Sequence, residues 1–376
     1  MGIKSLSEII KEHAPGVYEE VNINTYFGRR VGFDGSNLAC TYWAVALKEL
    51  VNTTEVGTEE INEGELAKAL YKAFVDHAVR FLNNGSTPVY IFDGEIRPEK
   101  SATCQARRDK GKALDEQIDG IQQQLKQYDA LSQPAGLVTQ LRTKMRQSVY
   151  IKPEFREQLM NLLKQLGLPV IRAKHDAEQL GALLCREGHL AAFFSRDTDA
   201  LTFGCPVVIR DINKARYEAG RKVMMCEVIR LDRLLDMLGL TQAEFVDMCI
   251  YAGCDFNVPP HGVGPVKCWS QFQQLGRNLD QLVALGYDIS QLKHLRCREI
   301  FAIVPSSTYM KDESLDVVSP FTSEDVINQL NLLLDSYGLL HQSSVISALY
   351  KQLPKPVKQS HDRPETPRVR LRLIAQ

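Results

Sequence analysis

Hydrophobic and polar positions follow a repeated pattern along the first 240 residues: short apolar runs alternate with longer amphipathic stretches. Four apolar runs predict strands, and each ends in or precedes acidic residues: RVGFD, PVYIFD, PVIRAKHDAE and LAAFFSRDTD. Between them, residues 64–82 and 153–166 have helical spacing. Strands that alternate with helices predict a parallel sheet covered on both faces, with its functional cleft at the carboxyl ends of the strands.

The rest of the chain divides into segments of different character. Residues 97–150 are polar and rich in Gln, with a break at SQPAG, and predict a helical insertion that stands off the sheet; a coiled hairpin for protein contacts is the alternative. Residues 241–276 predict helix, loop and helix, and further helices are expected over 323–337 and 343–353, the first capped by Ser323. From residue 355 the chain is basic and Pro-rich, which predicts a flexible tail.

Composition limits the class of protein. A chain of 376 residues that is 44% hydrophobic can bury a large core in one or two domains. It has no apolar run long enough to span a membrane, no signal-peptide core and no myristoylation pattern, so we expect no membrane attachment. The nine cysteines include no C-x-x-C pair, which predicts reduced thiols in an intracellular protein, without a disulfide framework or zinc site.

Charge gives two opposing signals. The formal net charge is −1, which by itself argues against nucleic-acid binding. Basic residues are nevertheless concentrated locally. There are six, against two acidic residues, between Arg97 and Lys112, and seven, against two, from Lys351 to the end.

Acidic residues at the strand ends are the main candidates for chemistry. One acid at such a junction is most often an N-cap, but here four junctions carry six acids, and a seventh follows CIYAGC. Carboxylates gathered in one place repel one another, so cations must hold them. Oxygen ligands favour Mg²⁺ or Mn²⁺, and a pair of such ions supports phosphoester hydrolysis. The seven acids are Asp34, Asp93, Asp176, Glu178, Asp197, Asp199 and Asp255.

The segment RDTDALT has a rival interpretation. It resembles the D-x-D-x-[TV] nucleophile motif of haloacid-dehalogenase-type phosphatases, in which the first Asp attacks phosphate. That family carries the motif near the start of its domain, whereas here three acid-bearing junctions precede it. We therefore favour metal binding by Asp197 and Asp199.

The order of the motifs resembles the XPG-type structure-specific nucleases, and within them the flap endonucleases. MGIKSLSEIIKEHAP, YFGRRVGFDGS, PVYIFDGE, DAEQLGALLCREG, DTDALTFG and CIYAGCDF…GVGP follow one another at similar spacing, so that the match runs from Met1 to about Leu353. The resemblance implies an α/β fold with a parallel-sheet, PIN-like nuclease core over residues 1–240 and a helical arch at about 97–150. It also implies a helix-two-turn-helix with C-terminal helices over 241–353, followed by a basic tail over 354–376.

The resemblance also implies a function. The chain would be a divalent-metal-dependent 5′ nuclease that hydrolyses DNA phosphodiesters at junctions of single strand and duplex, in replication and repair. A flap endonuclease is the leading interpretation. A 5′–3′ exonuclease of the same family and a DNA-binding scaffold that has lost catalysis are the alternatives. Every acidic position remains acidic, which argues against the scaffold.

Site residues carry over from the resemblance one position at a time. Asp34, Asp93 and Glu178 would hold one metal ion. Asp197, Asp199 and Asp255 would hold or orient the second, and Asp176 would act through metal-bound water. Lys100 and Arg107, at the base of the arch, would steer the scissile phosphate; a solvated helix face is the alternative reading of this pair. The DNA contacts would be Arg108, Lys110, Arg142, Lys144, Arg146, Gly262, Gly264 and Lys267, with K⁺ at the turn that holds the two glycines.

Several positions depart from the family pattern. Asp176 stands where relatives carry Glu, and Cys40 stands where they carry a Tyr that stacks on a base beside the scissile bond. Tyr42, two residues on, would face elsewhere on a helix. Near the duplex-binding turn, Pro259 and Val266 replace basic residues and His261 replaces a hydroxyl, which weakens the case for K⁺ and for tight duplex binding.

The expected partner is branched or flapped DNA, bound by a monomer. A sliding clamp is a further candidate, although no Q-x-x-[LIM]-x-x-[FY]-[FY] peptide stands near the C-terminus. The terminal RVRLRLIAQ suits either strand addition to a partner or a basic tail. In a eukaryotic host we expect a nuclear protein.

Overall fold

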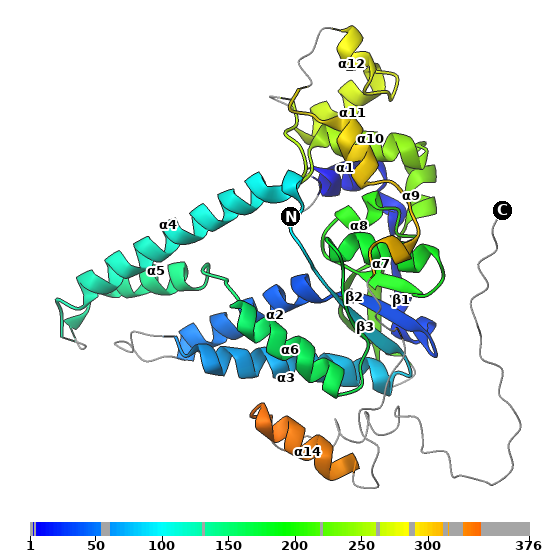
Figure 1. The fold of residues 1–376 in the computed structure, drawn as a ribbon. Helices are drawn as coiled ribbons and strands as arrows, with labels where there is room; N and C mark the ends of the chain where they lie inside the picture. Colours follow the sequence, from blue (N-terminus) through cyan, green and yellow to red (C-terminus); the bar gives the residue numbers. More distant parts are fainter. Residues whose placement is uncertain are drawn as a thin grey trace, which may run out of the picture.

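One sheet with helices on both sides forms the body of the molecule, and a pair of helices projects from it (Figure 1). The computed structural model describes residues 3, 5–53, 61–129, 132–218, 221–260, 264–285, 290–310, 315 and 326–339.

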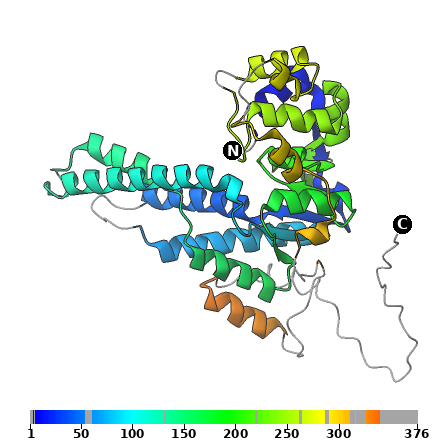
Figure 2. The same ribbon diagram turned by 45° about the horizontal axis from the view of Figure 1, so that its top comes forward.

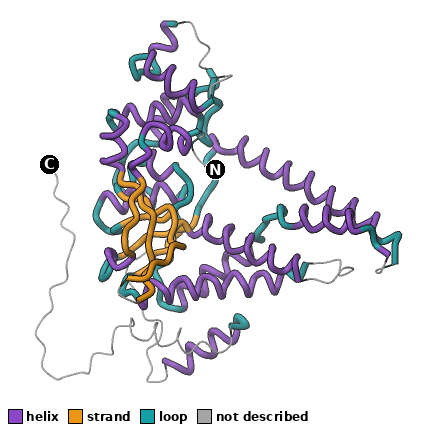
Figure 3. The backbone as a smooth tube through the Cα atoms, turned by 180° about the vertical axis from the view of Figure 1, so that it is seen from behind, coloured by secondary structure: helices purple, strands orange, loops and turns teal. Residues whose placement is uncertain are grey.

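The sheet has seven strands in the order β1-β7-β6-β5-β2-β3-β4. The five strands from β6 to β4 run parallel. The sequence predicts four of them, β2 to β5, but neither β6 nor the antiparallel edge that β7 and β1 add. Figure 3 shows the strands gathered among the helices. The strands are β1 (Tyr18–Asn22), β2 (Arg30–Asp34), β3 (Thr87–Phe92), β4 (Val170–Arg172), β5 (Ala192–Phe194), β6 (Val207–Glu218) and β7 (Arg221–Arg230).

Helices cover both faces of the sheet and form the upper part of the molecule. The α-helices are α1 (Leu6–His13), α2 (Gly35–Thr53), α3 (Glu63–Asn83), α4 (Ser101–Leu125), α5 (Ala135–Met145), α6 (Pro153–Gln165), α7 (Ala177–Arg186), α8 (Asp199–Thr202), α9 (Leu231–Leu238), α10 (Gln242–Ala252), α11 (Pro265–Gln274), α12 (Gln281–Ala284), α13 (His294–Ile300) and α14 (Val326–Ser336). Short 3₁₀ turns are η1 (Pro15–Val17), η2 (Ile23–Tyr26), η3 (Pro98–Lys100) and η5 (Ser306–Thr308).

Two apolar cores lie on opposite faces of the sheet because side chains alternate along each strand. In β3, Val89 and Ile91 join the core under α1, α7 and α10, while Tyr90 and Phe92 join the core under α2, α3 and α6. Gly32 of β2 leaves room for its neighbours in the first core, because a Cβ there would lie 2.6 Å from Leu190 and 2.9 Å from the Phe193 ring. The sheet is therefore buried on both faces, as the strand patterns predict.

The insertion at residues 97–150 stands off the sheet as a helical hairpin. Helices α4 and α5 lie side by side and extend away from the body (Figures 1 and 2). Within α4 only Ile121 and Leu125 are buried, and α5 buries no residue. The polar sequence of this segment therefore predicts its position correctly, because it lacks the apolar surface needed to pack into a core.

Helix positions agree with the sequence predictions for α3, α6, α7, α10 and α11. Helix α14 begins at Val326, and residue 323 lies outside the described residues, as do residues 340–376 with the helix expected over 343–353 and the basic tail. In the part of the chain that is described, no helix is both long enough and apolar enough to cross a membrane.

Candidate active site

The strand-end acids meet at one edge of the sheet. Strands β5, β2, β3 and β4 are parallel neighbours, so their carboxyl ends lie next to one another. Each end carries acids, and the loop between α10 and α11 adds one more from above. The strand-end acids are Asp34 after β2, Asp93 after β3, Asp176 and Glu178 at the start of α7, and Asp197 and Asp199 at the start of α8.

Two of these acids also cap helices. Asp34 Oδ1 accepts a 2.8 Å hydrogen bond from the backbone N–H of Asn37 in the first turn of α2. Asp93 Oδ1 accepts one of 2.9 Å from the N–H of Ala177, so it caps α7 from a different strand. The N-cap interpretation is therefore correct for Asp34, and it does not compete with a functional one, because capping uses one carboxylate oxygen.

The acids interact directly with one another. Glu178 and Asp34 share a hydrogen bond, and burial together with the charge of Asp93 raises the pKa of Asp34 to about 7. Burial and the charge of Asp34 also raise the pKa of Glu178 well above its usual range. The site therefore gathers more negative charge than it can hold at neutral pH without protons or cations.

Asp199 is one of the buried acids of this cluster. It is 6% exposed, and its Oδ1 atom is buried with no hydrogen-bond partner among the described residues. Burial and the charges of Asp197, Glu178 and Asp255 raise its pKa well above the usual range. A buried carboxylate oxygen without a donor is the kind of group that a hard cation would satisfy.

The loop that carries Asp255 is folded by its own side chains. Asn257 accepts a 2.9 Å hydrogen bond from the N–H of Cys254 and donates one of 2.8 Å to the carbonyl of Ile250. This turns the chain back over the end of α10. Thr103 of α4 donates to the carbonyl of Asp255, so the root of the arch is attached to the same loop.

Lys100 and Arg107 both face the acids. Lys100 Nζ lies 2.9 Å from Asp176 Oδ1 and 3.4 Å from Asp255 Oδ2. A guanidinium nitrogen of Arg107 lies 3.0 Å from Asp255 Oδ2. They therefore offset the charges of Asp176 and Asp255, and the alternative of a solvated helix face is wrong for Lys100, whose side chain is only 20% exposed.

Arg97 is a site residue that the sequence reasoning missed. It is 6% exposed, and its Nε donates a 2.9 Å hydrogen bond to Asp176 Oδ2. Gln179 accepts a second bond from the same guanidinium. The only sequence signal was the demand for a cation near the acids, which did not single out one arginine among several.

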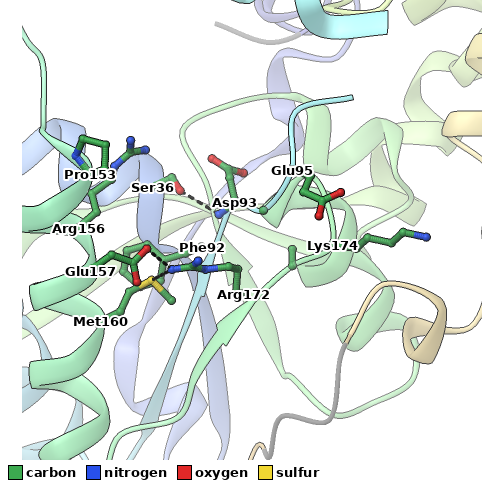
Figure 4. A pocket seen from close by; sticks show the side chains of 12 residues that line it. Ser36, Phe92, Asp93, Glu95, Pro153, Arg156, Glu157, Met160, Arg172 and Lys174 are labelled. Carbon is green, nitrogen blue, oxygen red and sulfur yellow. Dashed lines mark hydrogen bonds and ion pairs between the residues drawn. The ribbon is translucent and has the colours of Figure 1, made fainter. Parts of the chain in front are cut away.

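A cavity of about 520 Å³ opens beside Asp93, between the ends of β3 and β4 and the first turns of α6. In Figure 4 the Asp93 carboxylate points toward this opening, with Ser36 bound to its backbone N–H and Arg156 across from it on α6. Arg172 is paired with Glu157 at 2.5 Å. Asp93, alone among the seven acids, therefore lines a cavity that opens on the side of α6.

The described residues that are expected to bind DNA lie on α4, at α5 and at the start of α11. Arg108 and Lys110 are exposed on α4, Arg142 and Lys144 are partly exposed on α5, and Arg146 donates to Asn52 of α2. Gly264 caps α11 and Lys267 is exposed on it, while Gly262 and His261 lie outside the described residues.

Cys40, the departure from the family's stacking Tyr, lies on α2. Cys40 is exposed on α2, so no aromatic ring occupies that point near the acids. Tyr42 packs instead against Phe74, with ring centroids 5.5 Å apart. Tyr42 therefore does not take over the position of Cys40, as its place on the helix predicts.

Comparison with known proteins identifies the family. The XPG N-terminal domain matches residues 1–113, and the XPG I-region matches residues 167–255. Flap endonuclease 1 of Ovis aries is 30% identical over 283 residues, which cover 75% of this chain and 68% of that protein.

The chain belongs to the XPG family.

A second relative, flap endonuclease 1 of Trypanosoma cruzi, is 31% identical over 277 residues. That match covers 73% of this chain and 66% of the relative, so the chain spans slightly less than two thirds of the relative's length.

Solved structures confirm the XPG-type nuclease fold. The flap endonuclease-1 from Methanococcus jannaschii superposes with a TM-score of 0.56 at 18% identity, covering 91% of this chain and 98% of that one. The catalytic core of Rad2 in complex with DNA substrate gives a TM-score of 0.55 at 16% identity, covering 90% and 98%. The predicted α/β nuclease core is correct, with the antiparallel edge of β7 and β1 as an addition to the expected parallel sheet.

Proposed function

We propose that this XPG-family chain is a structure-specific 5′ nuclease, a flap endonuclease that hydrolyses DNA at junctions between single strand and duplex, in replication and repair. One observation carries the proposal. Seven acids from four strand ends and the α10–α11 loop meet at one edge of the sheet, directly under the root of a projecting helical hairpin. Metal-assisted hydrolysis of a phosphodiester uses such a carboxylate cluster, and a hairpin that stands off the sheet suits a single strand passing beside it.

The acids suit divalent metal ions by their chemistry. All seven acids offer only oxygen atoms to a cation, and Asp199 presents a buried oxygen without a hydrogen-bond donor among the described residues. Among the described residues, no group of three or more acidic, His or Cys side chains has the spacing of a preformed metal site. Several of the carboxylates are hydrogen-bonded to one another or paired with Lys100. In the proposal, Asp34, Asp93 and Glu178 would hold one Mg²⁺ or Mn²⁺ ion and Asp197, Asp199 and Asp255 a second. When bound, such ions supply Lewis-acid polarisation of the phosphate and activation of water.

Two cations of the chain would bind the scissile phosphate. Lys100 now pairs with Asp176 and Asp255, and Arg107 pairs with Asp255. We call this side of the acid cluster, next to the root of the hairpin, its entrance. A phosphate that enters there meets both side chains, and their hydrogen bonds to its oxygens would offset the negative charge that grows during hydrolysis. Asp176 already has a cation on each oxygen, which favours a role in orienting Lys100 over direct contact with a metal ion.

The hairpin and the helical upper region would bind the rest of the substrate. Arg108, Lys110, Arg142, Lys144 and Arg146 would contact the single strand, and the α11 start with Gly262, Gly264 and Lys267 the duplex. We extend the proposal to K⁺ at that turn, a monomeric state and, in a eukaryotic host, a nuclear location. A sliding clamp stays a candidate partner. All of these rest on the family resemblance.

The test is cleavage of a 5′-labelled single-flap duplex with Mg²⁺, beside a blunt duplex. Wild type should release a fragment cut near the flap base, and Asp199→Asn should lower the rate at least about 1,000-fold while DNA binding persists. The matched control is Asp236→Asn, on the exposed side of α9, which should cut like wild type. Release of mononucleotides alone would indicate the exonuclease. DNA binding without any cleavage, in Mg²⁺ or Mn²⁺, would indicate the scaffold and refute the proposal.

A further inference from the structure

Arg97 stands at the root of the hairpin, immediately before η3, and its guanidinium is engaged through Nε, one terminal nitrogen and its planar face. Its Nε donates to Asp176 Oδ2 at 2.9 Å, and a terminal nitrogen donates to Gln179 Oε1. Its planar face lies over the Tyr309 ring, 5.5 Å from the centroid. Gln179 is itself fixed, because its amide donates a 2.9 Å hydrogen bond to the carbonyl of Ile300. The guanidinium therefore has one well-defined position.

Asp176 connects this fixed arginine to Lys100. Its Oδ2 accepts from Arg97, and its Oδ1 accepts from Lys100 Nζ at 2.9 Å. The Asp176 side chain is only 8% exposed, so water does not compete strongly for either oxygen. Although burial raises the pKa of Asp176, Lys100 and Arg97 outweigh it and hold the pKa below its usual range. The carboxylate is thus a charged bridge between two cations.

Lys100 needs such a bridge because its flexible side chain does not by itself fix where the ammonium group lies. A lysine ammonium is a point charge on a flexible stem of four carbons, whereas an arginine guanidinium is a rigid, planar donor. Asp255 Oδ2 competes for the ammonium at 3.4 Å, and the Phe256 ring lies 5.9 Å away. With Asp176 held by Arg97, Lys100 stays between the two acids. Without Arg97, one oxygen of Asp176 would be buried unpaired and the carboxylate could turn away.

We propose that Arg97 is a positioning residue for the cleavage reaction: it fixes the Asp176 carboxylate, which in turn holds the Lys100 ammonium at the entrance to the acid cluster. This inference rests on the proposed nuclease function. Among the described contacts, Arg97 touches only Asp176 of the seven acids, and the other oxygen of Asp176 binds Lys100, so the effect of Arg97 passes through Asp176 to Lys100.

A purely structural role is the competing explanation. Arg97 also attaches the hairpin root to α7 through Gln179, and losing that attachment would loosen the hairpin whether or not Lys100 is present. The two roles differ in one measurable respect. Positioning through Lys100 disappears when Lys100 is absent, whereas a loosened hairpin lowers the rate in both backgrounds.

The experiment compares single-turnover cleavage of a single-flap duplex in Mg²⁺ by wild type, Arg97→Met, Lys100→Met and the double variant. Arg97→Met should lower the rate at saturating enzyme about 10- to 100-fold, with the Kd for the flap changed less than about threefold. Lys100→Met should lower the rate about 100- to 1,000-fold. The double variant should match Lys100→Met within about twofold. The control is Arg296→Met, an exposed arginine paired with Glu99 at the same root, which should cut like wild type.

A second measurement does not depend on activity. Urea unfolding in EDTA of wild type, Arg97→Met, Asp176→Asn and the double variant reports directly on the pair. The loss of stability in the double variant should be clearly smaller than the sum of the single losses. If Arg97→Met does not fold, Arg97→Lys replaces it in both measurements, because lysine keeps the charge but has no rigid second donor for Gln179. Its rate should fall at least about fivefold, and only when Lys100 is present.

Each outcome decides the matter. Equal rate losses with and without Lys100, a weaker Kd with an unchanged rate, or wild-type cleavage by Arg97→Met would each overturn the positioning role. Additive losses in the unfolding measurement would do the same. If wild type itself cuts no flap in Mg²⁺ or Mn²⁺, the proposed function fails instead, and the unfolding measurement still tests the Arg97–Asp176 bridge by itself.

Discussion

Asp34→Asn should stabilise the metal-free protein while it removes a residue that the proposed function requires. Asp34 is 2% exposed and lies against Glu178 and Asp93. Asparagine has nearly the same shape and keeps an oxygen that can accept the 2.8 Å hydrogen bond from Asn37 at the start of α2. The substitution therefore removes the charge and leaves the cap in place.

The size of the effect follows from the pKa of Asp34, which burial and Asp93 raise from 3.8 to about 7. The folded protein binds this proton more tightly than the unfolded chain does, so the stability of the metal-free protein falls as pH rises from about 4 to about 7. At 1.36 kcal/mol for each pKa unit, the full loss is about 4 kcal/mol. Relaxation of the neighbours and loss of the bond to Glu178 reduce the net gain on substitution to about 2 kcal/mol.

The assay is urea unfolding in EDTA at about pH 8 and about pH 4, with the exposed Asp236→Asn as control. Asp34→Asn should be more stable than wild type at about pH 8 and similar to it at about pH 4. Saturating Mg²⁺ should narrow or reverse the difference, because only wild type keeps all its carboxylate ligands. If Asp34→Asn is less stable than wild type in EDTA at about pH 8, the folded protein compensates the charge of Asp34 and the reasoning about a repulsive acid cluster is wrong.

Gly94→Ala should destabilise the protein and abolish cleavage, because the added Cβ would lie 1.9 Å from the carbonyl oxygen of Ala173. Gly111→Ala, in open space on α4, should instead raise the free energy of unfolding by about 0.5–1 kcal/mol. Equal melting temperatures for the two variants would contradict this. Burial lowers the pKa of His77 from 6.5 to about 3, so the imidazole is neutral in the folded protein, and the stability of the protein should fall as pH drops from about 6.5 toward about 3. In urea unfolding, His77→Phe should lose less stability than wild type between about pH 6 and pH 4. The same pH profile for both proteins would count against a buried neutral histidine. Lys144→Ala should weaken flap binding and reduce the slope of log K against log salt by about one, whereas an unchanged slope would place Lys144 off the DNA path.

Local pattern was enough to predict the acid edge. Each apolar run between helices predicts a strand, and parallel strands place their carboxyl ends together whatever the detailed packing. Asp34, Asp93 and Asp199 could therefore be located from sequence. The hairpin of α4 and α5 was equally predictable, because a polar segment of that length has no core to join.

The antiparallel edge of the sheet was not predicted. Strands β6 and β7 carry many charged residues, and their pattern resembles that of surface segments. They are held in the sheet by pairing of β6 with β5 and of β7 with β1, which stands some 200 residues earlier in the chain. Such pairing depends on contacts distant in sequence, and for this reason strand preference depends strongly on context.

By itself the sequence determined that carboxylates gather at one edge of a sheet and that cations must accompany them, because these follow from periodicity and charge. Only the tertiary structure decided which cations do so. Arg97 and Asp176 are 79 positions apart, and Lys100 and Asp255 come from the hairpin root and the α10–α11 loop. A hydrogen bond of 2.9 Å forms only if two backbone segments far apart in sequence come to lie at the right separation, and packing of the whole core sets that separation.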